Sequence, residues 1–118
     1  MVTVLPDRVL IDPMTVGYEG FHAFRITAIG GGWLDLTTIT ITAKWATATG
    51  TYVTGTVTVP TQTDDDLGAF EITTASTALT AALAGQWHLD IYLQRSGGNA
   101  RRIRTRCVAM LESRQTEA

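Results

Sequence analysis

TITITAKW, residues 38–45, alternates apolar and polar side chains over its whole length. The two isoleucines, Ala43 and Trp45 share one side of an extended backbone, whereas the threonines and Lys44 share the other. A period of two in β-branched residues predicts a strand with one face in a core and the other in water. This stretch therefore indicates an antiparallel sheet that is buried on one side.

The same alternation recurs along the chain, and glycines, prolines and polar loops separate the repeats. Ala75–Ala84 is the exception, because its alanines and leucines predict a short helical turn capped by Ser76 or Thr77. With seven to eight such strands we expect an all-β chain, an immunoglobulin-like antiparallel β-sandwich with one short helical turn. The further predicted strands are Phe21–Ile29, Thr51–Val53, Thr56–Val59, Ala69–Thr73, Gln86–Gln94 and Arg101–Met110.

A length of 118 residues fits one domain. We expect an extended N-terminal arm over residues 1–18, the sandwich over 19–111 and a flexible tail over 112–118. Val9, Leu10 and Ile11 lie between two prolines, which favours an edge strand or an arm over a central strand. The sequence leaves open whether this arm pairs with its own domain or with a neighbouring chain.

The last two strands form a hairpin around the turn at Ser96–Asn99. A three-residue loop predicts apolar cross-strand pairs on one face and polar or charged pairs on the other. A slip by one residue is disfavoured because it would set arginines against the core, whereas a slip by two keeps both faces. The predicted pairs are Trp87–Ala109, Leu89–Cys107, Ile91–Thr105 and Leu93–Ile103 on the apolar face, and Asp90–Arg106, Tyr92–Arg104 and Gln94–Arg102 on the polar face.

Hydrophobic residues make up 45% of the chain and charged residues 17%, with a net charge of −2. A near-neutral balance argues against a general nucleic-acid binder, which needs a basic excess to neutralise phosphates. We find no secretory signal at the start and no apolar run of about 18 residues, so we expect synthesis in the cytoplasm and no membrane partner. The single cysteine, Cys107, forms no internal disulfide, and we expect a small buried side chain there.

Few residues suggest chemistry. Asp64, Asp65 and Asp66 lack the spacing of a calcium loop, so a solvated loop tip is the better interpretation. His22 and His88 have no partner at zinc-ligand spacing, and no nucleophile or phosphate-loop motif is present. We therefore expect no catalytic residues, no metal site and no cofactor, and the chain is not predicted to be an enzyme.

Binding surfaces are the stronger candidates. Arg102, Arg104 and Arg106 form a basic ladder, which suits either an acidic partner or local pairing with groups such as Asp90. Trp33 follows three glycines and is a candidate interface anchor, whereas the other two tryptophans share the apolar side of their strands. The full set of interface candidates is Val9, Leu10, Ile11, Trp33, Tyr92, Arg102, Arg104 and Arg106.

Residues 21–110 also carry a series of elements in a familiar order. The series runs Asp35-Leu36-Thr37, Thr38–Thr42, Gly68-Ala69-Phe70-Glu71-Ile72, Thr74–Leu83, Ala84-Gly85-Gln86-Trp87 and Gly97-Gly98. In this the chain resembles the small immunoglobulin-like domains of tailed-bacteriophage structural proteins, including the N-terminal domains of baseplate upper proteins. The resemblance covers about three-quarters of the chain, and its pattern holds no catalytic signature.

This resemblance implies a non-catalytic virion protein of the tail, baseplate or capsid surface. Such a protein docks onto other virion structural proteins in a symmetric assembly, is a homo-oligomer or part of one, and is located in the virion. The alternative is a carbohydrate- or receptor-binding β-sandwich module. Exposed aromatic side chains grouped on one face would favour that alternative, and Trp33, Tyr52 and Tyr92 are the residues to examine.

Overall fold

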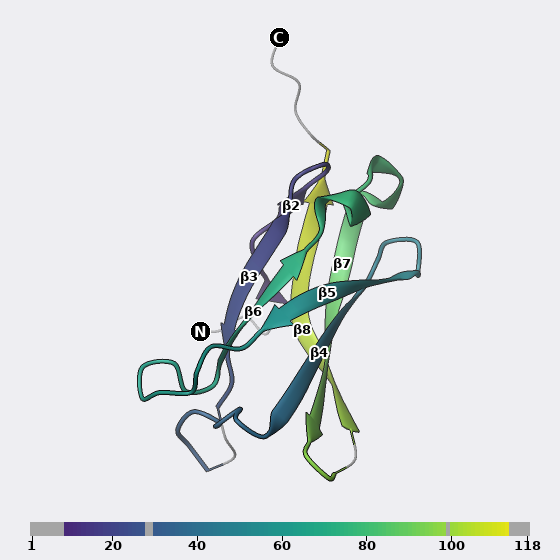
Figure 1. The fold of residues 1–118 in the computed structure, drawn as a ribbon. Coiled ribbons are helices and arrows are strands. Elements are labelled where there is room, and N and C mark those ends of the chain that lie inside the picture. Colours follow the sequence, from purple (N-terminus) through teal and green to yellow (C-terminus); the bar gives the residue numbers. More distant parts are fainter. Residues whose placement is uncertain (1–8, 28–29, 99, 114–118) are drawn as a thin grey trace, which may run out of the picture.

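The computed structural model describes residues 9–27, 30–98 and 100–113, without the side chains of residues 9–10, 100–104 and 106. Within this part the chain forms eight strands and two single turns of 3-10 helix (Figure 1). The prediction of a mostly β chain with about seven to eight strands is confirmed. The strands are β1 (Val9–Leu10), β2 (Met14–Thr15), β3 (Gly20–Arg25), β4 (Ile39–Ala46), β5 (Tyr52–Thr58), β6 (Ala69–Thr74), β7 (Gly85–Arg95) and β8 (Ala100–Glu112), and the turns are η1 (Ser76–Ala78) and η2 (Ala81–Leu83).

The strands follow one hydrogen-bonded order, β1-β8-β7-β4-β5-β6-β3, and β2 also pairs with β8. All pairs are antiparallel except those of β1 and β2 with β8, which are parallel. The order curls into a nearly closed cylinder around the core, so that β2 and β3 approach each other (Figure 1). A Cβ on Gly20 of β3 would lie 2.7 Å from Met14 Sδ of β2.

β5 joins the two halves of this order because it changes partner along its length. Its first half pairs with β4 as far as Gly55 opposite Ala43, and its second half pairs with β6 from Thr56 onward. Gly55 permits this crossing, since a Cβ there would lie 2.5 Å from Ile72 Cγ2. The two short strands predicted around this glycine are therefore one continuous strand.

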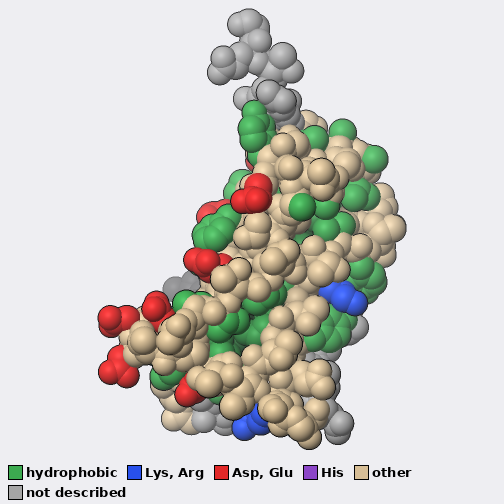
Figure 2. Space-filling model, viewed as in Figure 1, with side chains coloured by type: hydrophobic (Ala, Val, Ile, Leu, Met, Phe, Trp, Pro, Cys, Tyr) green, Lys and Arg blue, Asp and Glu red, His purple; other side chains and the backbone are tan. Residues whose placement is uncertain are grey.

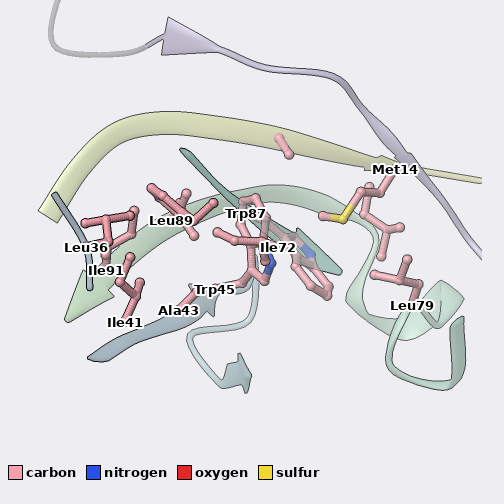
Figure 3. Packing of buried hydrophobic residues seen from close by; sticks show 13 residues of the cluster. Met14, Leu36, Ile41, Ala43, Trp45, Ile72, Leu79, Trp87, Leu89 and Ile91 are labelled. Carbon is pink, nitrogen blue, oxygen red and sulfur yellow. The ribbon is translucent and has the colours of Figure 1, made fainter. Parts of the chain in front are cut away.

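The core lies inside the curled sheet, where the apolar sides of the strands meet (Figure 3). Trp45 on β4 and Trp87 on β7 are both fully buried, as predicted, and their ring centroids lie 6.3 Å apart. Met14 and Leu79 close one end of the core, and Leu36 lies at the other end (Figure 3). The fully described cluster contains Met14, Leu36, Ile41, Ala43, Trp45, Phe70, Ile72, Leu79, Trp87, Leu89, Ile91, Ala109 and Leu111.

Both buried indoles keep a hydrogen bond. Trp45 Nε1 donates to Thr74 Oγ1 at 3.0 Å, and Trp87 Nε1 donates to the Leu83 carbonyl oxygen at 2.8 Å. A buried indole N–H without an acceptor would lose its bond to water at a cost of about 1–3 kcal/mol. The helical segment between β6 and β7 therefore supplies an acceptor to the core.

That segment differs in detail from the helical turn predicted over Ala75–Ala84. It consists of two separate 3-10 turns, η1 and η2, and the residues that precede them, Ala75 and Thr80, make no capping bond through a side chain. The predicted cap at Ser76 or Thr77 is therefore wrong, since both residues lie inside η1. Leu79 between the turns is 1% exposed, so packing of this leucine holds the segment in place.

The predicted arm and tail both contribute residues to the sheet. Residues 1–18, predicted as an arm, contribute β1 and β2, and residues 1–8 lie outside the described part. Strand β8 runs to Glu112, and residues 114–118 of the predicted tail also lie outside the described part.

Candidate docking surfaces

The N-terminal candidates lie beside β8. Val9 and Leu10 pair in parallel with Cys107 and Val108, and the Ile11 amide donates to the Val108 carbonyl oxygen at 2.9 Å. Ile11 is half-buried and packs against the core. The sequence left open whether this segment pairs with its own domain or with a neighbouring chain, and its main chain pairs with its own domain.

The hairpin of β7 and β8 carries the basic ladder, and its predicted register is right at one end only. Trp87 pairs with Ala109 as predicted, but beyond an irregularity between His88 and Asp90 every pair is shifted by two residues. A shift by two residues keeps each side chain on the same side of the sheet, and the sequence pattern allowed a slip of this size. The observed pairs are Asp90–Arg104, Ile91–Ile103, Tyr92–Arg102, Leu93–Arg101 and Gln94–Ala100 in place of the predicted ones.

Thr105 lies at this irregularity, and its side chain bonds backbone groups that have no ladder partner there. Its Oγ1 donates to the Leu89 carbonyl oxygen at 2.6 Å and accepts from the Cys107 amide at 3.1 Å. A bulge leaves backbone groups without ladder partners, and here one hydroxyl serves a carbonyl and an amide. The predicted pairing of Ile91 with Thr105 is wrong because Thr105 is used in this way. Cys107 itself is half-buried against the core.

Asp90 departs most from expectation. Alternation along β7 turns it away from the core, toward the face predicted to be wet, yet its side chain is 1% exposed. In register it stands between Lys44 on β4 and Arg104 on β8, and it has a bonding partner. A buried carboxylate needs such partners, since burial of a lone charge is strongly unfavourable. The backbone register therefore places this buried acid between two basic residues.

Tyr92, another interface candidate, is half-buried on the same face of β7. Lys44 Nζ lies 5.6 Å from the centroid of its ring, a cation–π contact. The predicted cross-strand partner, Arg104, is replaced in the register by Arg102. The side chains of Arg102, Arg104 and Arg106 lie outside the described ones, so their role as a docking surface stays a prediction.

Trp33 lies at a loop edge, as predicted, and is 43% exposed. A single bridge pairs it with Thr27, and the guanidinium carbon of Arg25 lies 4.1 Å from the centroid of its ring. Arg25 Nε also donates to the Leu67 carbonyl oxygen at 2.8 Å. The partly exposed indole is thus held against the end of β3.

β3 presents exposed aromatic surface that the sequence interpretation missed. Phe21 points outward from β3 and is 54% exposed, and Tyr18 just before the strand is 52% exposed. Among the described strands, β3 pairs only with β6, so it forms an edge of the sheet. The pattern of residues 21–29 placed Phe24 inward, and the same parity could have marked Phe21 as an outward aromatic.

His22 faces the core beside this exposed residue and is 5% exposed. Its Nε2 lies 2.8 Å from the Asp12 carbonyl oxygen, so Nε2 carries the proton and donates. The ring lies 5.3 Å from that of Trp45, and Nδ1 has no hydrogen-bond partner among the described residues. His22 therefore fastens the segment before β2 to β3.

The predicted loop tip at Asp64–Asp66 forms an exposed turn between β5 and β6. No group of three metal-ligating side chains converges within the described part of the chain. Elsewhere, Asp35 Oδ1 accepts bonds from the Thr37 hydroxyl at 2.6 Å and from the Thr37 amide at 2.9 Å. The hydroxyl bond, followed by the amide bond, lowers the pKa of Asp35 from its ordinary value of 3.8.

The three aromatic residues of the alternative function are not gathered on one patch. Tyr52 is 56% exposed and stands opposite Ala46, whereas Tyr92 stands opposite Thr42, four residues earlier in β4. Trp33 lies at the end of β3, against Arg25. This arrangement does not favour the binding of one carbohydrate by all three rings.

No protein-family model matches the chain, and no curated protein is similar to it in sequence. Among the described residues, neither 3-10 turn has the length or the apolarity needed to cross a membrane.

Proposed function

We propose that this chain is a non-catalytic structural protein of a bacteriophage virion that docks onto other virion proteins through the outward side of β3. One observation carries this proposal: an aromatic side chain, Phe21, is 54% exposed on a strand with a single partner among the described strands. An edge strand offers backbone donors and acceptors to another chain, and an exposed aromatic ring beside it provides an anchor.

The proposed fold behind this function is an immunoglobulin-like sandwich. In that fold one sheet contains the third, sixth and seventh strands of the domain, and the other contains the second and fifth. Strands β4, β7 and β8 match the first set, and β3 and β6 match the second, with β5 passing between them. The buried Trp45 on β4 corresponds in place to the tryptophan that marks the third strand of immunoglobulin domains.

The residues that carry the resemblance to phage domains support the fold more than the function. Phe70, Ile72 and Trp87 are buried, so they contribute to the core. Gly68 has a φ of +81°, and a Cβ there would lie 2.6 Å from the Ile26 carbonyl oxygen. Because these residues serve the core, they support the proposed scaffold, and the assignment to a virion rests on the resemblance to phage proteins with such a scaffold.

The mechanism of such a protein is geometric. A preformed sheet presents an edge and an exposed ring, and the partner adds a strand or a loop along that edge. Each contact is weak, but many copies in a symmetric particle engage together and bind with high avidity. The function proposed here needs no reacting group.

The test is the composition of purified particles produced by the genome that encodes the chain. We expect the wild-type protein in gradient-purified particles, and we expect Phe21→Thr to lower its amount there by about tenfold, as for loss of an aromatic anchor. Tyr52→Thr is the matched control, because Tyr52 is also an outward and exposed aromatic residue on a strand. Absence of the wild-type chain from the particles contradicts the proposal.

A further inference from the structure

The curled sheet closes between β2 and β3, and this closure differs from the other strand contacts. Each neighbouring pair in the strand order is joined by backbone register pairs, whereas no register pair joins β2 to β3 among the described strands. Side chains make the contact instead. His22 Nε2 donates to the Asp12 carbonyl oxygen at 2.8 Å. Met14 Sδ lies 2.7 Å from the position of a Cβ on Gly20. We call this contact between residues 12–15 and β3 the seam.

The backbone of β3 faces the seam with groups that are suited to bond a further strand. β3 pairs with β6 over all six of its residues, and such pairing on one side leaves the donors and acceptors of the other side to another strand. Residues 12–15 lie beside this second side without forming a ladder, because β2 pairs with β8. A strand between β2 and β3 would therefore extend the sheet at β3, beside the exposed ring of Phe21.

The seam covers side chains that are buried in the closed molecule. Met14 is 2% exposed and His22 is 5% exposed, and the centroid of the His22 ring lies 5.3 Å from that of Trp45. His22 Nδ1 has no hydrogen-bond partner among the described residues, so this ring contributes one bond to the seam. Opening of the seam would keep every register pair of the described strands. It should therefore cost less than separation at any of the ladders.

The turn between β2 and β3 permits such an opening. The Tyr18 amide donates to the Thr15 carbonyl oxygen at 3.1 Å, which closes the turn, and Gly17 within it has a φ of +87°. No atom of the described residues beyond its chain neighbours lies within 4 Å of a Cβ position on Gly17. A few residues of a turn absorb the change in backbone angles when two elements move apart. The seam can therefore widen from its Asp12 end while the turn keeps β2 and β3 connected.

The charges around the seam indicate the chemistry of a partner. Asp12 and Glu19 are exposed near its two ends, and Glu71 is half-buried on the neighbouring strand β6. Acidic side chains gather along this side of the molecule, with apolar surface between them (Figure 2). Arg25, the basic residue of β3, already lies over an indole ring and donates to a backbone carbonyl. This arrangement favours an entering segment that carries both basic and apolar side chains.

We propose that the seam opens in the folded protein and admits an extended segment with basic and apolar side chains from another virion protein. This segment pairs with β3 by strand addition, and residues 12–15 cover the site in the free chain. The inference rests on the proposed function for the source of the segment, whereas opening of the seam is a property of the chain alone. Two experiments test these two parts.

The first experiment measures opening through the rate at which a buried thiol is labelled by iodoacetamide in the folded chain. Met14→Cys places a thiol under the seam, and Leu89→Cys places one on β7 where the side chain is fully buried. Both variants carry Cys107→Ala, so that no other thiol reacts. We expect labelling at position 14 to be at least about 100-fold faster, because position 89 is reached only by global unfolding. Rates that follow the global unfolding equilibrium of each variant, measured in urea, would overturn the opening.

The hydrogen bond across the seam is tested with His22→Phe in the same two backgrounds. This substitution keeps an aromatic ring against Trp45 and removes the donor to Asp12, so labelling at position 14 should rise about tenfold. His88→Phe is the matched control, because His88 is the other histidine and lies half-buried on β7, outside the seam. Labelling should not change in that control. A rise of equal size at position 89 would show global destabilisation and contradict a local opening.

The second experiment tests whether a partner strand separates β2 from β3 in the particle. Met14→Cys with Gly20→Cys, again with Cys107→Ala, brings two thiols together across the closed seam. Met14 Cγ lies 3.1 Å from the Cβ position on Gly20, and a disulfide needs a Cβ separation of about 3.5–4.5 Å. An inserted strand would hold β2 and β3 about 9.5 Å apart, which is two strand spacings. We expect oxidation to form the bond in nearly every free chain and in at least about tenfold fewer chains of gradient-purified particles.

The outcomes distinguish the inference from the proposed function. Equal formation of the disulfide in free chains and in particles overturns entry through the seam and leaves docking onto other virion proteins standing. Absence of the wild-type chain from purified particles overturns the proposed function and the partner with it. In that case the labelling rates still decide whether the seam opens in the chain alone.

Discussion

Phe21 on β3 and Asp90 on β7 are both turned away from the core by strand alternation, but the aromatic ring is 54% exposed and the carboxylate 1% exposed. Usually the apolar side chain is buried and the charged one is solvated. The outward side of β7 is therefore covered within the monomer at Asp90, which lies between strand neighbours on both sides. The outward side of β3 has exposed apolar surface, and this is the surface that we propose to dock onto a partner.

The largest expected effect is the loss of the buried carboxylate. We expect Asp90→Ala to lower the free energy of unfolding by about 3 kcal/mol, because the group that interacts with this buried carboxylate loses its counterpart. Urea denaturation followed by circular dichroism measures this change. Asp64→Ala is the control, since this exposed turn residue should alter stability by no more than about 0.5 kcal/mol. Equal effects of the two substitutions would mean that burial of Asp90 does not make it important for stability.

The second prediction concerns the irregularity that displaces β8 beside Asp90. Thr105→Val keeps the shape of the side chain but removes the hydroxyl that serves the Leu89 carbonyl and the Cys107 amide. We expect a loss of about 2 kcal/mol in the same denaturation experiment, because two half-buried backbone groups lose a bond. Thr54→Val on the exposed side of β5 should change stability by less than about 0.5 kcal/mol. If the two variants are equally stable, Thr105 does not hold the register.

Alternation was sufficient to predict most strands and the buried tryptophans of the core, but it divided β5 in two and did not mark β2. The inward sides of β4 and β7 were assigned from sequence, and both tryptophans on them are fully buried. The register of the β7–β8 hairpin was predicted correctly at Trp87 but not beyond His88. A side-chain hydroxyl that replaces ladder bonds leaves no periodic signal, so a pattern with a period of two does not reveal it.

The sequence predicts which way a strand side chain points better than it predicts how far that side chain is exposed to solvent. Parity places Asp90 and Phe21 on outward sides, but burial there depends on which strands lie alongside and what covers them. Asp90 has neighbours in register on both sides, whereas Phe21 lies on an edge. This difference follows from the strand order, which local alternation does not specify. The exposed aromatic surface at β3, proposed above as a docking surface, was missed for that reason.

A third prediction tests whether the exposed ring contributes to the monomer. We expect Phe21→Thr to change the free energy of unfolding by no more than about 0.5 kcal/mol, since the ring has little contact to lose and threonine suits a strand. Urea denaturation followed by circular dichroism at low protein concentration provides the measurement. A loss above about 2 kcal/mol would mean that the ring supports the fold, and the contrast with Asp90 would disappear.

The smallest expected effect is on the pKa of Asp35, an exposed carboxylate that accepts hydrogen bonds without being buried. Asp35 has its pKa lowered from 3.8, first by the Thr37 hydroxyl and then by the Thr37 amide. A carboxyl whose pKa is lower in the folded than in the unfolded chain adds stability above pH 3.8 and loses it as the pH falls through the folded value. Thr37→Val removes the larger cause and keeps the amide, so the pKa should rise part of the way toward 3.8.

Carboxyl carbon shifts followed by NMR through an acid titration measure this pKa directly. Thr38→Val is the matched control, because Thr38 is the exposed neighbour of Thr37 and its bond to the Ser96 amide uses only the backbone carbonyl. The pKa of Asp35 should be unchanged in that variant. An equal rise in both variants would assign the shift to the turn as a whole. A rise confined to Thr37→Val would show that hydrogen bonds alone, without burial, favour the ionised carboxyl at Asp35.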